Sequence, residues 1–381
     1  MDALTTPSNW QRVRLGDVAH IFDGTHQTPQ YTHYGVAFFS VENIVSDKPS
    51  KFISQQDYLT ATNQNRPEYN DILLTRIGTI GVSKVVNWNY PFSIYVTLAV
   101  IKQSKYFNSY YLHYFIQSNF FQKELKNNSL LQAIPCKINM NELKKCEVIL
   151  PPLNEQIAIA NILSDVDRYL YSLDALILKK ESVKKALSFE LLSQRKRLKG
   201  FNQNWQRVRL GDICEIVKGQ QINKISLNNT DKYPVINGGI DFLGYTNKFN
   251  VSKNTIAISE GGTCGYVRFM TSDFWSGGHN YSLQKISNKV NNLCLYHILK
   301  SYEKDIMKLG VGSGLKNIQL KALKDFEILL PPLDEQIAIA NILSDVDSEI
   351  ISLKNKKRQF ENIKKALNHD LMSAKIRVLK K

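Results

Sequence analysis

Two segments of this chain occur twice with almost no change. Residues 10–17 read WQRVRLGD, and residues 205–212 read the same eight letters. A second segment, PPLNEQIAIANILSDVD, spans residues 151–167 and returns at 331–347 with Asp in place of one Asn. Because such repeats indicate a repeated structural unit, the chain is predicted to contain two copies of one architecture. We call these repeated segments the frame and the sequences between them the inserts.

The two inserts differ from each other as clearly as the frame segments agree. The first frame segment repeats after 195 residues and the second after 180, so the inserts differ in length by 15 residues. A duplication without functional meaning would diverge evenly along its length. The contrast instead indicates that both copies of the frame face the same kind of partner or pack on each other, whereas the two inserts have different targets.

A long helix is predicted after each PPL tripeptide. Asn154 and Asp334 are the expected N-caps, and Glu155 and Glu335 favour the first helical turn. Neither helix contains Pro, and the first contains no Gly before Gly200. Each helix of roughly 45 residues would be about 65 Å long, which is typical of a coiled coil. The apolar heptad positions are Ile159, Leu163, Val166, Leu170, Leu173, Ile177, Val183, Leu187 and Leu191, and then Ile339, Leu343, Val346, Ile350, Leu353, Phe360, Ile363, Leu367 and Leu371.

Both inserts have the composition of small domains of mixed α/β structure. Short apolar runs such as DILLTRIGTIGVSKVV (71–86) and NTIAISEGGTCGYVRFM (254–270) are broken by glycine, which predicts strands and hairpins. Helices are expected between them at 109–126 and 292–309. The predicted organisation is a first domain at 1–150, a first helix at 151–200, a second domain at 201–330 and a second helix at 331–381.

The positive charge of the chain lies mainly on the predicted helices. The formal net charge is +15, of which +13 falls within residues 168–200 and 348–381. A basic protein of this size commonly binds a polyanion. The helical charges are either a solvated coiled-coil face or a surface that contacts phosphate. The inserts are close to neutral, so polar side chains and local basic residues in them would read bases.

Sequence motifs of catalysis and metal binding are missing. There is no P-loop, Rossmann fingerprint, H-E-x-x-H or G-x-S-x-G motif, and no adenine-methyltransferase tetrapeptide. The five cysteines form no C-x-x-C pair, and His26 and His33 are too weak a pattern to predict a metal site. No run of about 18 uncharged apolar residues and no signal peptide occur, so a cytoplasmic protein outside the membrane is expected. A binding subunit without catalytic activity is favoured.

The frame resembles that of a known family. WQRVRLGD, an insert, PPLNEQIAIANILSDVD and a long helix, followed by the same order again, are similar to the DNA-specificity (S) subunits of type I restriction-modification enzymes. The resemblance covers essentially the whole chain. LLTRIGTIGVS (73–83) and ISEGGTCGYV (258–267) also resemble the glycine-containing strands of that family's target-recognition domains. The implied fold is α+β, with two mixed α/β target-recognition domains separated by two long antiparallel helices and related by pseudo-two-fold symmetry.

The resemblance also implies a function. Each domain would read one half of a bipartite, asymmetric site in double-stranded DNA, and the helices would set the spacing between the halves. The S subunit itself would be non-catalytic and would need no cofactor. Two methyltransferase (M) subunits would dock on the frame, and restriction/translocase (R) subunits would join the complex. S-adenosylmethionine, ATP and Mg are expected on these partner subunits.

Base-reading residues are predicted from chemistry, because Arg or Lys donates to guanine, Gln or Asn pairs with adenine, and glycine allows close approach of the backbone. For each single residue an ordinary role in a turn or strand is the alternative. The loop at 130–139 also lacks the glycines of 310–317, which leaves its role open. The DNA-binding candidates are Thr25, His26, Gln27, Thr75, Arg76, Thr79, Ser83 and Lys84 in domain one, and Lys218, Gln220, Gln221, Asn237, Ser259, Glu260, Thr263, Tyr266, His279, Asn280 and Ser313 in domain two.

Partner docking is predicted for the start of each long helix, part of which must also pack on its own domain. Other functions stay open beside the S-subunit hypothesis. These are a coiled-coil scaffold, a stand-alone DNA-binding protein without restriction-modification partners, and an enzyme that uses scattered residues. The partner-binding candidates are Glu155, Gln156, Ile159, Ala160, Asn161, Glu335, Gln336, Ile339, Ala340 and Asn341.

Overall fold

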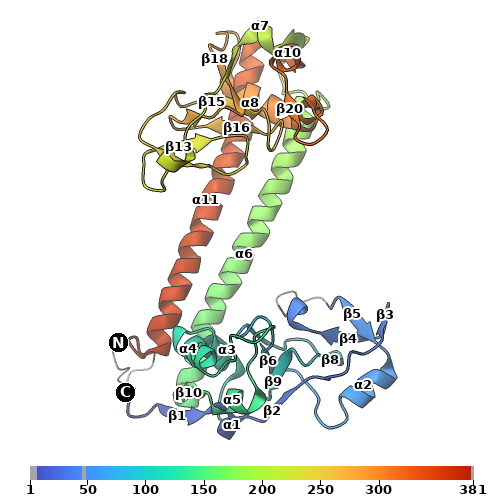
Figure 1. Ribbon diagram of the computed structural model, residues 1–381, viewed down its shortest axis with the longest axis vertical. Coiled ribbons are helices and arrows are strands. Elements are labelled where there is room, and N and C mark those ends of the chain that lie inside the picture. Colours follow the sequence, from blue (N-terminus) through green and yellow to red (C-terminus); the bar gives the residue numbers. More distant parts are fainter. Residues whose placement is uncertain (1–6, 45–48, 379–381) are drawn as a thin grey trace. The chain divides into compact units, whose positions relative to one another are not determined.

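The computed structural model describes residues 7–44 and 49–378, which divide into two compact units (Figure 1). Unit 1 contains the described residues of 1–174 and 356–381, and unit 2 contains residues 175–355. Each unit therefore combines one insert with parts of both long helices. The expectation about a signal peptide concerns the N-terminus, where residues 1–6 lie outside the described part. No helix among the described residues is long and apolar enough to cross a membrane.

Unit 1 contains two four-stranded sheets and a terminal ribbon. Its strands are β1 (Gln11–Arg14), β2 (Ile21–Asp23), β3 (Tyr31–Thr32), β4 (Val36–Phe39), β5 (Lys51–Ile53), β6 (Ile72–Thr75), β7 (Ser83–Val85), β8 (Phe92–Ile94), β9 (Leu98–Ile101) and β10 (Glu147–Leu150). The sheets have the strand orders β2-β9-β6-β7 and β3-β5-β4-β8, and β1 pairs with β10. The short helices are α1 (Leu15–Val18), η1 (Val41–Asn43), α2 (Gln55–Ala61), α3 (Ser109–Ile116), α4 (Asn119–Asn127) and α5 (Met140–Lys145).

Unit 2 repeats this plan with a smaller second sheet. Its strands are β11 (Gln206–Arg209), β12 (Glu215–Lys218), β13 (Tyr233–Ile236), β14 (Gly244–Thr246), β15 (Thr255–Ser259), β16 (Val267–Met270), β17 (Trp275–Ser276), β18 (Asn280–Gln284), β19 (Gly310–Val311), β20 (Asn317–Ile318) and β21 (Glu327–Leu330). The sheet β12-β18-β15-β16 matches β2-β9-β6-β7 of unit 1, and β11 pairs with β21 as β1 does with β10. The short helices are α7 (Leu210–Ile213), η2 (Lys224–Ser226), α8 (Asn292–Ser301), α9 (Glu303–Lys308) and α10 (Leu320–Lys324).

The predicted helices at 109–126 and 292–309 are present, but each is divided in two. In unit 1 the break lies at Ser118, whose hydroxyl donates to the Phe115 carbonyl and accepts from the Phe121 amide at the start of α4. A serine that caps the following helix in this way ends the preceding one. In unit 2 the break lies at Tyr302, between α8 and α9.

The main core of each unit lies between its four-stranded sheet, its short helices and the ends of both long helices. In unit 1 this core joins Ile72 and Ala99 of the sheet with Phe115 of α3 and with Leu163 and Leu371 of the long helices. The core of unit 2 is built in the same way, from Ile256 and Leu283 to Leu191 and Leu343. Burial of this apolar surface is the main favourable contribution to folding of each domain on its helices.

The two long helices are α6 (Leu153–Leu192) and α11 (Leu333–Met372). Each begins one residue before the predicted cap, so the assignment of Asn154 and Asp334 as N-caps is wrong. The carbonyl of Pro152 accepts hydrogen bonds from the amides of Glu155 and Gln156, which makes proline the cap residue.

Both long helices have 40 residues instead of the predicted 45 or so. Two residues after each helix end, the backbone is left-handed, with φ of 59° at Gln194 and 58° at Ala374. The Lys196 amide then donates to the Glu190 carbonyl, and the Ile376 amide to the Asp370 carbonyl. Each helix is therefore closed by a hydrogen bond that spans six residues around a left-handed residue. That conformation usually requires glycine, which explains why the sequence did not reveal the helix ends.

Within each unit the two long helices are antiparallel, as the resemblance implied. In unit 1 Asp167 pairs with Lys364 and Asp174 with Lys357, both at 2.6 Å. A later residue of α6 thus contacts an earlier residue of α11, as expected for antiparallel helices. In unit 2 the contacts are Glu181–Lys354 at 2.6 Å, Lys184–Asp347 at 2.5 Å and the pair Lys180–Glu349. These helical lysines therefore have carboxylate partners on the opposite helix, and only part of the basic charge remains for phosphate.

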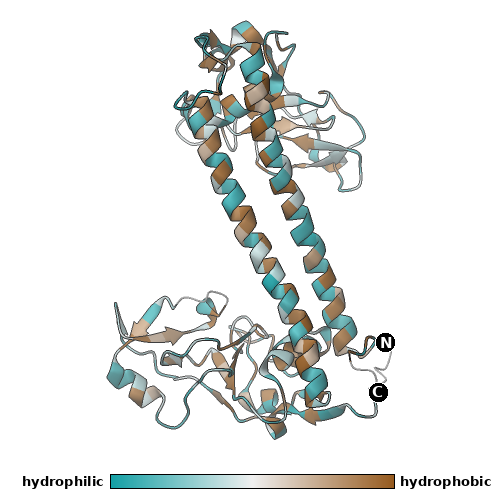
Figure 2. Ribbon diagram, turned by 180° about the vertical axis from the view of Figure 1, so that it is seen from behind, coloured by the Kyte–Doolittle hydropathy of each residue, from teal (hydrophilic) through white to brown (hydrophobic). Residues whose placement is uncertain are grey.

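Apolar residues recur along both helices (Figure 2) and largely follow the predicted heptads. Leu173, Ile177 and Ile350 are buried between the helices. The exceptions are Val183 and Ile363, which occupy equivalent positions and are 41% and 50% exposed. Their assignment to the helix interface is wrong, because the neighbouring residues Lys184 and Lys364 face the opposite helix there.

Candidate nucleic-acid interface

A buried glutamate fixes each long helix to its own domain. In unit 1 the Glu155 carboxylate accepts from the Trp10 indole at 3.1 Å and from Nε and Nη2 of Arg377 at 2.7 and 3.1 Å. In unit 2 Glu335 accepts from Trp205 at 2.9 Å and from Arg197 at 2.8 Å twice. Both glutamates are at most 2% exposed. A buried carboxylate is stable when a bidentate arginine and a further donor satisfy it, as here.

The neighbouring glutamine has an equally fixed position. Gln156 accepts from the Asn108 amide at 2.9 Å and donates to the Tyr106 and Pro151 carbonyls. Gln336 does the same with the Asn291 amide at 2.7 Å and the Lys289 and Pro331 carbonyls. The two glutamines therefore tie the first turn of each long helix to the loop before α3 or α8.

These contacts separate the ten partner-docking candidates into two groups. Asn161 and Asn341 are exposed. The other residues are buried within their own unit, where their side chains are not available to a partner, because they hold the helix to its domain. These are Glu155, Gln156, Ile159, Ala160, Glu335, Gln336, Ile339 and Ala340. The structure adds residues that the sequence analysis missed, namely the exposed apolar side chains of Leu153, Ile157, Leu333 and Ile337.

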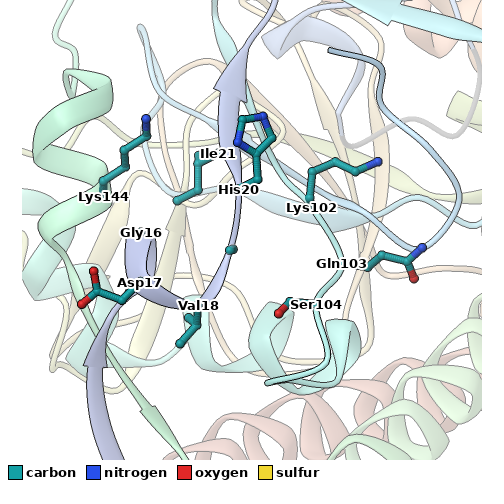
Figure 3. Close-up of a pocket in the computed structure, with 10 residues that line it drawn as sticks. Gly16, Asp17, Val18, His20, Ile21, Lys102, Gln103, Ser104 and Lys144 are labelled. Carbon is teal, nitrogen blue, oxygen red and sulfur yellow. The ribbon is translucent and has the colours of Figure 1, made fainter. Parts of the chain in front are cut away.

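A hollow in unit 1 lies beside the repeated Leu-Gly-Asp turn and is lined by Gly16, Asp17 and Lys144 (Figure 3). The turn itself packs closely against a short helix later in the domain. A Cβ at Gly16 would lie 2.9 Å from Cβ of Lys144, and one at Gly211 would lie 3.1 Å from Cβ of Lys324. Glycine at this position therefore allows α1 to contact α5 and α7 to contact α10. Lys102 lines the same hollow, and its ammonium is 2.7 Å from Glu68 and 2.8 Å from Asp71. The hollow thus belongs to the packing of the domain.

The candidates of domain one gather where β2 and β6 end. Arg76 is buried and donates to the Ile138 carbonyl at 3.2 Å, the Val96 carbonyl at 2.9 Å and Asp23 at 3.0 Å. Burial lowers the pKa of Arg76, and Asp23 opposes that shift. His26 is exposed and lies 3.2 Å from the same Asp23 oxygen. Thr25, Gln27 and Thr79 lie in the turns that follow the two strands, with Gln27 and Thr79 exposed.

Domain two has a corresponding cluster where β12 and β15 end and β18 begins. The Lys218 ammonium is 2.7 Å from Glu260, which also accepts from the Tyr281 hydroxyl at 3.2 Å. Burial and Glu260 raise the pKa of Tyr281 to about 12. His279 lies 3.9 Å from the other Glu260 oxygen, and its amide donates to the Asn237 side chain. The exposed residues of this region include Lys218, Gln220, Gln221 and His279, and Thr263 is half-buried.

Several other candidates lie inside the domains or make internal contacts. Thr75 is fully buried and accepts from the Val82 amide. Ser83 is buried and bonds to His113 at 2.9 Å, and the Lys84 ammonium lies over the Trp88 ring. In domain two Ser259 and Asn280 are buried against each other, and Tyr266 lies beneath the cations of Arg268 and Lys300. The structure gives these six residues positions in the fold and does not place them on the exposed strand ends.

Both domains have a loop beside the glycine turn, in spite of the different sequences. In domain one Leu130 bridges to Lys137, and the Gly78 amide donates to the Cys136 carbonyl. In domain two β19 and β20 form the equivalent hairpin, with Ser313 exposed near its tip. The loop at 130–139 therefore keeps its place without the glycines of 310–317.

One residue at the strand ends was missed from the sequence. Asp23 accepts from both Arg76 and His26 and lies at the position of Lys218 in the other domain. Aligning the chain after the repeated RLGD segments would have revealed it, because Asp23 and Lys218 both follow six residues later, directly before a glycine.

Comparison with known proteins identifies the family. Residues 7–180 and 202–362 match the family model described as the type I restriction modification DNA specificity domain. A protein of Mycoplasma pneumoniae named as a type I specificity subunit is 40% identical over 151 residues, which span 39% of this chain and 40% of that protein. A second relative, from Mycoplasma genitalium, is also covered over only 40% of its length.

Two further similarities cover nearly the whole chain. A protein of Methanocaldococcus jannaschii named as the specificity subunit of a type I restriction enzyme is 28% identical over 98% of this chain and 95% of its own length. The crystal structure of the type I restriction-modification S subunit from M. genitalium aligns with a TM-score of 0.70 over 97% of this chain and 98% of that one. The two share 19% of their residues, so this likeness shows a common fold. Because the family model matches well over half of the residues, the chain belongs to the family of type I restriction-modification DNA-specificity proteins.

Proposed function

We propose that this chain is the non-catalytic specificity subunit of a type I restriction-modification complex. It binds a bipartite, asymmetric site in double-stranded DNA and directs the methyltransferase and restriction subunits to it. This proposal depends on one observation. The repeated frame makes the same contacts in both copies, whereas the residues at the strand ends differ between the two domains. Glu155 and Glu335 have matching partners, whereas the polar residues at the ends of β2 and β12 differ in type and charge.

Recognition is proposed to take place at the strand ends and neighbouring loops. Residues such as His26, Gln27, Gln220, Gln221 and His279 are exposed there and offer donors and acceptors suited to base edges in the major groove. The helical lysines with carboxylate partners would contribute little to this step. Lysines and arginines outside those pairs would contact phosphate and raise affinity without selecting sequence.

The exposed start of each long helix is the proposed docking site for one methyltransferase subunit. Leu153 and Ile157 in the first copy, and Leu333 and Ile337 in the second, are between 39% and 46% exposed. Their sequence surroundings differ only by Asn154 in place of Asp334. Exposed apolar side chains in a repeated pattern suit two identical partners. S-adenosylmethionine, ATP and Mg are proposed to bind to the partner subunits.

Mapping of methylated adenines tests the proposal in cells. A strain with this gene should carry one bipartite methylated motif that disappears when the gene is deleted and returns with a plasmid copy. A strain that keeps an unchanged methylation pattern after deletion would contradict the proposal. Incubation of the purified chain alone with DNA and S-adenosylmethionine, or with DNA and Mg²⁺, should give no turnover.

The spacing role of the helices has a separate test. Seven residues inserted into both helices at the same level, after Asp174 in α6 and after Asn355 in α11, preserve the antiparallel pairing and the heptad. The insertion lengthens each helix by about 10 Å, which corresponds to at most about three base pairs. The expected result is a longer spacer between unchanged half-sites. Changed half-site sequences would show that the helices do not act as a ruler.

A further inference from the structure

The ends of β2 and β12 are structurally equivalent positions. In domain one the Arg76 amide donates to the Thr97 carbonyl and the Ile138 amide to the Arg76 carbonyl, each at 2.9 Å. In domain two the Glu260 amide donates to the His279 carbonyl and the Ile318 amide to the Glu260 carbonyl, again at 2.9 Å. The strand pairings β2–β9 and β12–β18 have the same register. Asp23 therefore corresponds to Lys218, and Arg76 to Glu260.

The ion pair at this position has opposite polarity in the two domains. In domain one an acid at the end of the first strand, Asp23, pairs with a base before the glycine turn, Arg76, at 3.0 Å. In domain two a base at the end of the first strand, Lys218, pairs with an acid before the glycine turn, Glu260, at 2.7 Å. The inner member is the less exposed one in both, with side-chain exposures of 7% for Arg76 and 11% for Glu260.

A third residue changes together with the pair. Ala99 in domain one corresponds to Tyr281 in domain two, by the register of β9 and β18. The Ile138 carbonyl accepts from Arg76, whereas the equivalent Ile318 carbonyl accepts from the Tyr281 hydroxyl at 2.9 Å. Tyrosine thus supplies the hydrogen bond that the arginine makes in domain one. In both domains, therefore, the ion pair has the hydrogen-bond partners that its polarity requires.

The outer member of each pair keeps hydrogen-bonding capacity. Among the described residues, both bonds to Asp23 end on Oδ2, so Oδ1 can still accept. Lys218 is half-exposed and uses one ammonium proton on Glu260, so two protons can still donate. A carboxylate accepts from the amino group of cytosine or adenine, whereas an ammonium donates to O6 and N7 of guanine.

We propose that Asp23 and Lys218 contact bases from equivalent places with opposite chemistry, so that domain one selects a base with an exposed amino group where domain two selects guanine. Arg76 and Glu260 are positioning residues that hold the two outer groups. This inference rests on the proposed function and specifies how two domains of one design read different half-sites. It assigns a specificity role to Asp23.

The test is selection of bound duplexes from a pool with randomised positions, using the full-length chain. Lys218→Gln removes the positive charge and leaves an amide, which suits adenine and not guanine. The double change Lys218→Glu with Glu260→Lys restores an ion pair of reversed polarity. Asp23→Asn makes the corresponding change in domain one. The matched control is Glu215→Lys with Lys285→Glu, which reverses a 2.7 Å pair formed between the other ends of β12 and β18.

Lys218→Gln should weaken the preference at one position of one half-site by at least about five-fold, and the reversed pair should favour a base with an amino group there. Asp23→Asn should affect one position of the other half-site only, and the control should leave both unchanged. The melting temperature of each variant separates altered reading from unfolding. If the double variant with the reversed pair does not fold, the base preferences of Lys218→Gln and Asp23→Asn still test the inference.

A folded variant set that keeps the wild-type preference in both half-sites would overturn the inference and leave the proposed function intact. In that case the pairs would only stabilise the domains. If the wild-type chain selects no sequence at all, the proposed function fails and the inference fails with it.

Discussion

Glu155 in unit 1 and Glu335 in unit 2 have the same kinds of neighbours at similar distances, a tryptophan indole and a bidentate arginine. The strand ends of the same domains have ion pairs of opposite polarity, Asp23–Arg76 and Lys218–Glu260. A carboxylate that is almost fully buried tolerates few alternatives, because its loss leaves the arginine without a partner. In the strand-end pairs the outer members, Asp23 and Lys218, have side chains that are 22% and 52% exposed, so water partly solvates them and reversal of the pair costs less. The comparison therefore separates positions that determine the fold from positions free to determine the ligand.

The largest effect is expected from breaking one copy of the buried cluster. Glu335→Ala should lower the free energy of unfolding of unit 2 by about 3–5 kcal/mol, because Arg197 and Trp205 lose their acceptor. Glu155→Ala should have the same effect on unit 1. Hydrogen exchange resolved by peptide measures each unit separately. Equal loss of protection in both units after either change would contradict the independence of the two clusters.

A second effect should appear in acid and concern both units. Burial lowers the pKa of His113 to about 4, with Lys364 and Lys84 adding to the shift and Asp167 opposing it. Burial also lowers the pKa of His297 to about 4, with Asp347 opposing the shift and Lys184 adding to it. The unfolded chain takes up these protons near pH 6.5 and the folded chain only near pH 4, so stability falls as the pH falls between these values.

The size of this loss is roughly 3 kcal/mol for each histidine, from a pKa difference of about 2.5. Denaturant unfolding between pH 7 and pH 4 measures it. His113→Gln should flatten the acid response of unit 1 alone and His297→Gln that of unit 2 alone. If neither variant changes the loss of stability in acid, that loss comes from titratable groups other than these two histidines.

A third effect should distinguish the two proposed docking sites. Ile157→Asp should weaken the binding of one methyltransferase subunit, because it places a charge in the apolar contact, and Ile337→Asp should weaken the other. We expect a loss of about ten-fold or more in affinity at the changed site. Native mass spectrometry should show complexes with one methyltransferase subunit for each single variant and none for the double variant. Asn154→Ala, on the first turn of α6, is the control, and two bound subunits in the double variant would reject the site.

The smallest effect compares two equivalent contacts between the long helices. Tyr169 and Phe360 have ring centroids 4.6 Å apart in unit 1, where unit 2 has the ion pair of Glu349 with Lys180. Lys180→Ala should cost at most about 1 kcal/mol, and less in high salt. Phe360→Ala should cost more and should not respond to salt, because it removes apolar contact. A salt-dependent cost for Phe360→Ala would contradict this assignment.

The sequence predicted the architecture better than the individual roles. The duplication, the two mixed domains and the antiparallel helices followed from the repeats, the apolar periodicity and the resemblance. The end of each helix did not, because Gln194 and Ala374 adopt a conformation that usually requires glycine. The exposed face at Val183 was also missed, since a heptad pattern does not show that Lys184 turns toward Asp347.

The candidate site was predictable in region and much less so in detail. The strand ends around Arg76 and Glu260 were found from their glycine turns. The burial of Thr75, Ser83 and Asn280 could not be read from residue type, because the same polar side chains serve in turns, sheets and interfaces. The internal role of Gln156 depends on the loop before α3, which is 48 residues away in the sequence.

The two arginines that pair with the buried glutamates lie at different places in the sequence, so the two domains are completed at different times during synthesis. Arg197 is made before Glu335, and all of unit 2 lies within residues 175–355. Glu155, by contrast, waits for Arg377, which leaves the ribosome 222 residues later. Since domains form as their residues emerge, domain one begins first and is completed last. A nascent chain arrested before residue 377 would hold an almost finished domain one whose buried carboxylate still lacks its counter-charge.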